Sequence, residues 1–249
     1  MIKWQVIRTI VDNPPPQLVY AWDERLPQEQ IALSLISEES TGPQTPVTPE
    51  TLLEVIKKND LKLAEDLRKM DDTVDSLYSS IKYYLTKISR EALAEEESRR
   101  WTDIISFTIN MEQIGDIIER VLIDIEDKKI RPGRSFSEAG MAEIVELHER
   151  LIDNLRLGMS VFLNGTVRDA QKLLQEKARF RDLERAYAGT HLSRLSANTV
   201  QSFETSSLHI DLISELKRIN SHICSIAYPI LDSAGALAPN RLRQSALVD

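Results

Sequence analysis

The stretch Trp101–Glu126, which reads WTDIISFTINMEQIGDIIERVLIDIE, decides the fold of this chain. Its apolar residues recur at alternating spacings of three and four, which is the period of one helix face and not the alternation of a strand. These apolar residues are Ile104, Phe107, Met111, Ile114, Ile118, Val121 and Ile125. The stretch therefore predicts a long amphipathic helix with one face in a core.

Two further segments carry the same period, one from Leu63 to Ile88 and one from Leu212 to Ile230. The chain has 249 residues but only eight glycines, so it offers few positions for tight turns. Its 42% hydrophobic and 28% charged residues are typical of a globular protein with a sizeable core. We therefore predict an all-α fold of long antiparallel helices packed in bundles.

Composition also excludes several classes of function. A net charge of −8 argues against a general nucleic-acid binder, because affinity for the phosphate backbone needs a broad basic surface. No uninterrupted apolar run reaches the roughly 18 residues of a membrane span, and the start, MIKWQVIRTIVDNPPP, is too broken by charge for a secretory signal. The single cysteine, Cys224, cannot form an internal disulfide, which favours a reducing, cytoplasmic setting.

Proline and turn residues predict the domain boundaries. Seven of the ten prolines fall within the first 49 residues, so residues 1–50 are predicted to be irregular, with one short helix at 28–39. A first helical unit is predicted over 51–134, with a turn at Asn59 and Asp60, and a second over 135–233. In the second unit Ser137 is an expected N-cap, Gly165 an expected stop, and the last helix is expected over 203–232. Residues 234–249 are predicted to be a disordered tail.

The two units look like copies of one another. The string DSLY at 75–78 matches ERAY at 184–187, and 114–116 align with 219–221 about 105 residues later. The second unit shows three helix patterns, beginning near Ser137, Thr166 and Phe203. The first unit shows two long patterns, and the proline-rich start stands in place of its opening helix. We therefore predict a pseudo-repeat of two three-helix units, the first of them incomplete.

Four carboxylates form the candidate site: Asp71 with Asp75, and Glu112 with Asp116. Each pair is spaced by four, so both members lie on one helix face. Two such helices side by side gather hard oxygen ligands suited to iron, manganese, magnesium or calcium. The alternative is that these residues are the solvated flank of an acidic bundle, which is common beside a core stripe.

Other chemistry finds little support in the sequence. None of the four histidines follows a glutamate at the Glu-x-x-His spacing of di-iron enzymes. His222 is expected to be packed and hydrogen-bonded, and Cys224 to be a buried, inert thiol. The basic run 128–134 suits either an acidic or lipid surface or, more simply, the end of a helix. No phosphate-binding loop or nucleophile motif is present, so we predict a protein that is not an enzyme.

The string NMEQIGDIIER, at Asn110–Arg120, resembles the signature helix of PhoU-type proteins. Further strings resemble one branch of them: DSLYSSIKYYL from Asp75, FSEAG from Phe136, ELHER from Glu146, ETSSLHIDL from Glu204, LKRINSH from Leu216 and AYPIL from Ala227. Together, over 51–233, they resemble the PhoU-like cytoplasmic domain that follows the membrane part of bacterial sodium-dependent phosphate cotransporters.

This resemblance implies a non-catalytic regulatory or accessory domain of phosphate transport. It would act at the inner face of the plasma membrane by docking to a membrane phosphate transporter, to its transmembrane domain or to a second copy as a homodimer. Some relatives hold metal, so the resemblance places a divalent or ferric ion on Asp71, Asp75, Glu112 and Asp116. In the second unit Lys217 and Ser221 match Glu112 and Asp116, and only Glu184 stays acidic. A metal-binding protein and a plain helical adaptor remain the alternatives.

Overall fold

The computed structural model describes residues 50–89, 93–196 and 204–237, and these are almost entirely helical. The predicted all-α fold is confirmed. The helices are α4 (Glu50–Lys58), α5 (Leu61–Ile88), α6 (Glu95–Ile125), the π-helical turn η1 (Glu126–Ile130), α7 (Glu138–Asn164), α8 (Val167–Ser196), α10 (Ser206–Ser225) and α11 (Ala227–Ser233). The predictions for residues 1–49, the helix at 28–39 among them, and for 238–249 lie outside the described residues.

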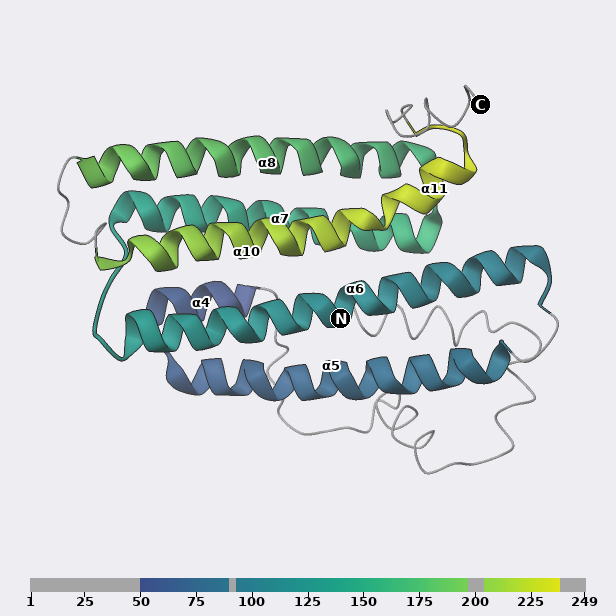
Figure 1. Cartoon of the computed structure of the whole chain (residues 1–249), viewed down its shortest axis with the longest axis horizontal. Coiled ribbons are helices and arrows are strands. Elements are labelled where there is room, and N and C mark those ends of the chain that lie inside the picture. Colours follow the sequence, from purple (N-terminus) through teal and green to yellow (C-terminus); the bar gives the residue numbers. More distant parts are fainter. Residues whose placement is uncertain (1–49, 90–92, 197–203, 238–249) are drawn as a thin grey trace, which may run out of the picture.

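The long helices lie side by side in two groups, and those that follow one another in the chain run antiparallel (Figure 1). In the first, α5 packs along α6, and the short α4 packs against both. In the second, α7, α8 and α10 pack on one another, and α11 continues along α8. Packing of α6 on α10 joins the two groups, while α4 also touches α7.

Local capping chemistry sets several helix ends where it was predicted. Asn59 has a left-handed φ of 57° between α4 and α5, and the Asp60 carboxylate accepts from Leu63 N at 3.0 Å at the start of α5. Ser137 Oγ likewise accepts from Gly140 N at 3.2 Å. Gly165 ends α7 with a φ of 61°, a conformation that a Cβ would strain.

The prediction of one continuous last helix is wrong. The structure has α10 to Ser225 and a separate α11 from Ala227. Pro229 explains the break, because it has no N–H to donate to the carbonyl four residues before it and its ring crowds that carbonyl. The opening helix of the first unit is present rather than replaced: within the described residues it is α4, with nine residues, against 27 in the corresponding α7.

A buried lysine fastens α4 to the end of α6. The Lys129 side chain is only 2% exposed, and its Nζ donates to the Ile56 carbonyl at 2.9 Å and to Asn59 Oδ1. Lys129 lies on η1, whose wider π-helical winding shifts the side-chain register at the end of α6. Burial lowers the pKa of Lys129, and its hydrogen bonds satisfy the amine and a helix-terminal carbonyl together.

The core has two parts. The main cluster runs through both units and includes Val55, Ile125, Ile144 and Leu216. A second cluster, against the first half of α6, contains Phe107, Met159 and Phe162, with the two phenyl rings stacked at 4.0 Å between centroids. The two units are therefore held together along both halves of α6. Within the described ranges, no helix combines the length and the apolar character needed to cross a bilayer.

Candidate functional site

The packing of α5 on α6 brings together three of the four predicted carboxylates. Oxygen atoms of Asp71, Asp75 and Asp116 all lie within 4.8 Å of one another. Asp71 is half-buried and the other two are exposed. Glu112 is not part of this group, but it lies close enough to feel its charges. Burial, and then the charges of Asp116 and Asp75, raise the pKa of the Glu112 carboxyl. The structure thus places Glu112 at the edge of the cluster.

Gly115 is a site residue that the sequence reasoning missed. The Asp71 carboxylate lies directly against Gly115 on α6, and a Cβ built at this glycine would overlap Asp71 Oδ1. A glycine inside a helix costs about 1 kcal/mol relative to alanine, so its presence in the middle of α6 was an available signal. It lets the carboxylate approach the α6 backbone more closely than any other residue would.

The donor set determines what this cluster can bind. All of its ligand atoms are carboxylate oxygens, which are hard donors preferred by calcium, magnesium, manganese and ferric iron. Such an ion would take Asp71, Asp75 and Asp116 as ligands and fill its remaining positions with water. Exposed acidic groups also occur together without an ion, so the solvated acidic face remains the alternative.

The matching place in the second unit has different chemistry. Lys217 Nζ on α10 donates to Glu184 Oε1 on α8 at 2.9 Å. Ser221 Oγ turns back to the Lys217 carbonyl at 3.0 Å. A side-chain ammonium therefore neutralises the carboxylate here, where the first unit gathers several acidic groups.

A second charged cluster, also missed from sequence, is buried where α7, α8 and α10 meet. Arg194 forms a two-pronged ion pair with Glu143, at 2.6 Å and 2.7 Å, and Thr190 Oγ1 donates to the same carboxylate at 2.7 Å. His209 Nε2 lies 3.1 Å from Glu143 Oε2, and its ring stacks on His191 at 4.6 Å. These contacts tie three helices together, so the role of this cluster is structural.

The same cluster contains strongly shifted groups. Burial, then the neighbouring His191 and Arg194, lower the pKa of His209 to about 4. Burial alone would raise the pKa of Glu143, but hydrogen bonds from Arg194 and Thr190 outweigh it and lower that pKa instead. At neutral pH the folded cluster therefore holds a neutral His209 beside an ionised Glu143.

We expect the protein to lose stability in mild acid because of His209. Its folded pKa of about 4 lies below the usual 6.5, so below pH 6.5 the unfolded chain takes up a proton that the folded chain refuses, and stability falls until about pH 4. Between pH 7 and 5 this linkage costs about 2 kcal/mol. Urea unfolding at both pH values measures it. The variant His209→Gln should show a shallower fall than wild type, and an equal fall would contradict the assignment.

The remaining predicted residues behave as simple packing groups. His222 Nδ1 lies 2.9 Å from Asn110 Oδ1 across the α6–α10 contact, so the expected hydrogen-bonded histidine is confirmed. Cys224 is fully buried, and burial raises the pKa of its thiol to about 12, as expected for an inert cysteine.

Comparison with known proteins points to one family. The family model "PhoU domain" matches residues 50–125 and 144–230. The "Putative inorganic phosphate export protein YjbB" of Escherichia coli strain K12 is 47% identical over 168 residues, which are 68% of this chain and 31% of that protein. The protein of the same name from Salmonella typhimurium strain LT2 is 45% identical over 186 residues, 74% of this chain and 34% of that one.

This chain thus spans about a third of the length of these relatives. Among solved structures, that of "the phosphate transport system regulatory protein PhoU from Streptococcus pneumoniae" superposes with a TM-score of 0.64. The match covers 77% of this chain and 89% of that one at 14% sequence identity, so it supports the fold.

Proposed function

Because the chain belongs to the PhoU domain family, as its motifs predicted, we propose that it is a non-catalytic regulatory domain of phosphate transport. It acts by docking to a membrane phosphate transporter or to the transmembrane part of its own protein, at the inner face of the plasma membrane. The observation that carries this proposal is the 47% identity to a part of a protein named for phosphate export. The bacterial sodium-dependent phosphate cotransporters remain the predicted branch.

The described side chains support a docking role over catalysis. Buried polar groups of the protein hold helices together. Arg194 donates hydrogen bonds to Glu143, and Lys129 donates one to the Ile56 carbonyl. The thiol of Cys224 is protonated and enclosed. A helical body whose two units are joined by two core clusters along α6 suits the transmission of a contact rather than the conversion of a substrate.

A domain exchange in the Escherichia coli relative tests this function. The matching 168 residues of that protein are deleted, or replaced by those of this chain, and export of radiolabelled phosphate from cells is measured. We expect the deletion to alter phosphate flux and the exchange to restore it towards the unmodified level. Western blotting of membranes controls for abundance. An exchanged protein that is present in membranes but behaves as the deletion would contradict the proposal.

The first-unit cluster supports a second function, the binding of a divalent or ferric metal ion. The supporting observation is that oxygen atoms of Asp71, Asp75 and Asp116 lie within 4.8 Å of one another, with Asp71 seated against Gly115. Glu112, at the edge, would contribute through a bound water. The positive charge of an ion would relieve the mutual repulsion of these carboxylates.

We expect stoichiometric metal in wild-type protein and none in the double variant Asp75→Asn with Asp116→Asn. Elemental mass spectrometry on protein purified without chelators or metal resins gives the measurement. Glu65→Gln with Asp127→Asn is the matched control, since it removes the same number of charges from exposed positions on α5 and on η1, which continues α6. Added metal should raise the Tm of the wild-type protein and of the control variant, and should leave the Tm of the double variant Asp75→Asn with Asp116→Asn unchanged. Equal metal content in all three proteins would exclude the site.

A further inference from the structure

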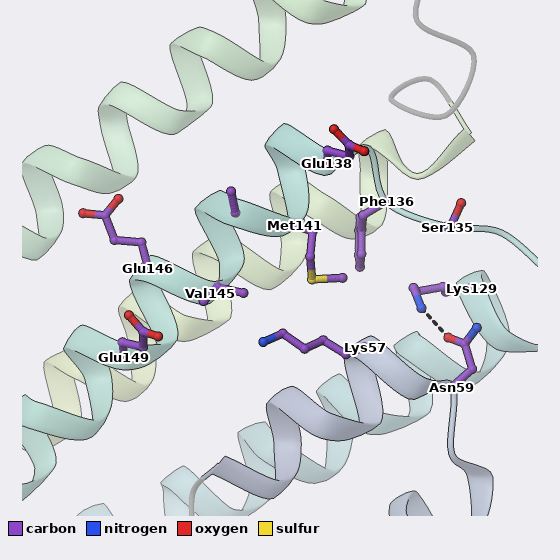
Figure 2. Close-up of a pocket in the computed structure, with 11 residues that line it drawn as sticks. Lys57, Asn59, Lys129, Ser135, Phe136, Glu138, Met141, Val145, Glu146 and Glu149 are labelled. Atoms are coloured by element: carbon purple, nitrogen blue, oxygen red, sulfur yellow. Dashed lines mark hydrogen bonds between the residues drawn. The ribbon is translucent and has the colours of Figure 1, made fainter.

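An open groove lies between α4 and α7, where the two units meet (Figure 2). It has a volume of about 620 Å³. Lys57 and Asn59, at the end of α4, form one wall, and the first three turns of α7 form the other. Phe136, Met141, Ala142 and Val145 give it an apolar lining. The groove lies away from the carboxylate cluster of α5 and α6 and belongs to no site described above.

The α7 wall has the pattern of a helix-binding face. Its lining residues from Glu138 to Glu149 recur at helical spacing, so they form a single stripe about 16 Å long. Other faces of α7 pack on α8 and α10. Among the described helices α4 flanks this stripe, and its nine residues are too few to cover it. Within the described residues the stripe therefore keeps an apolar surface that a further helix of two to three turns would cover.

Hydrogen bonds within the protein hold both walls of the groove in place before any partner binds. Lys129 Nζ fixes the end of α4 through the Ile56 carbonyl at 2.9 Å and lies 5.8 Å from the centre of the Phe136 ring. Ser137 caps the start of α7. Walls held in this way lose little conformational freedom when a partner binds, which favours affinity.

The charges along the groove select the partner. Glu138, Glu146 and Glu149 line the α7 side, and Figure 2 shows Lys57 projecting from the α4 side towards them. Glu146 is already bound by Arg150 and Tyr187, whereas Glu138 and Glu149 are exposed. Lys129 uses its amine internally. The exposed carboxylates of the α7 wall, beside an apolar lining, fit a cationic segment and repel an anionic lipid surface.

We propose that this groove docks a basic amphipathic helix of a partner protein. The apolar stripe of that helix lies on Met141, Val145 and Phe136, and its lysine or arginine side chains pair with Glu138 and Glu149. The inference deepens the proposed docking function, because it assigns both the surface and the chemistry of the segment that binds. Its test needs only this chain, so its failure is distinguishable from a failed domain exchange.

The test uses two synthetic helical probes of about 14 residues, with the same leucine stripe and either lysine or glutamate on both flanks. Binding to the full chain is followed by fluorescence anisotropy at about 0.15 M salt. We expect the lysine probe to bind at least about tenfold more tightly than the glutamate probe. Glu138→Lys with Glu149→Lys should reverse this preference, and Val145→Asp should weaken both probes. The control variant Asp153→Lys with Asp182→Lys, which changes the same charge outside the groove, should keep the wild-type preference for the lysine probe.

Circular dichroism and Tm confirm that each variant is folded before its binding is interpreted. Equal binding of the two probes, or a preference that survives the Glu138 and Glu149 changes, would overturn the proposal. So would analytical ultracentrifugation showing a dimer of wild type that Val145→Asp dissociates, since the occupant would then be a second copy of this chain. Absence of binding by the full chain would also overturn it.

Discussion

Replacing Glu143 with alanine should lower the free energy of unfolding by about 3–5 kcal/mol. The carboxylate is 8% exposed and accepts both prongs of Arg194 together with the hydroxyl of Thr190. Its loss leaves the guanidinium of Arg194 mostly enclosed, with side-chain exposure of 19%, and without its counter-charge. The substitution also removes the contact between the start of α7 and the end of α8. Urea unfolding at pH 7 gives the measurement.

A matched control and a rescue make this prediction specific. Glu149→Ala removes an exposed glutamate from the same helix and should change stability by less than about 0.5 kcal/mol. Glu143→Leu combined with Arg194→Leu removes both charges at once and should recover most of the loss, because no buried charge stays unpaired. A Glu143→Ala protein that unfolds within 1 kcal/mol of wild type would show that water reaches Arg194 freely.

Phe162→Ala should also cost about 3–5 kcal/mol, in this case through a cavity. Phe162 is 5% exposed and stacks on Phe107 at 4.0 Å. Arg100 covers the other side, with its guanidinium 4.6 Å from the ring centre and a hydrogen bond of 3.2 Å to the Phe162 carbonyl. The small cluster around Phe162 is fixed on the helices α6 and α7, so its neighbours fill only part of the space that the ring leaves.

Hydrogen exchange should show where the Phe162→Ala damage lies. Loss of the ring loosens α6 from the end of α7, so amides around Phe107 should exchange faster than those around Ile125, which lies in the main core. Leu192→Ala is the control, since Leu192 is 66% exposed and its loss should be nearly neutral. Uniformly faster exchange along α6 would instead mean that the two core clusters act as one unit.

The features that sequence predicted well depend on neighbours in the chain. The turn at Asn59 and Asp60, the Ser137 cap and the Gly165 stop each use atoms within four residues, so local chemistry suffices to place them. The same rule would have found the break before α11, since Pro229 was visible in the sequence. Its effect on the carbonyl four residues earlier was not weighed against the apolar period.

The features that sequence missed depend on how helices are rotated against one another. A spacing of four places Asp71 and Asp75 on one face, but only the packed pair of helices shows that Asp116 joins them while Glu112 stands aside. Glu143 and Arg194 are 51 residues apart, and nothing near either residue marks it as the partner of the other. The contact of Asp71 with Gly115 likewise exists only once α5 has docked on α6.

The hydrogen bonds of Lys129 have a consequence for its covalent chemistry. A lysine reacts with acylating reagents only when its amine is uncharged and reachable, and Lys129 meets the second condition only after α4 has left the end of α6. Lys57, on the surface of α4, is reachable throughout. The rate at which Lys129 is acylated relative to Lys57 therefore measures how often the joint between α4 and α6 opens.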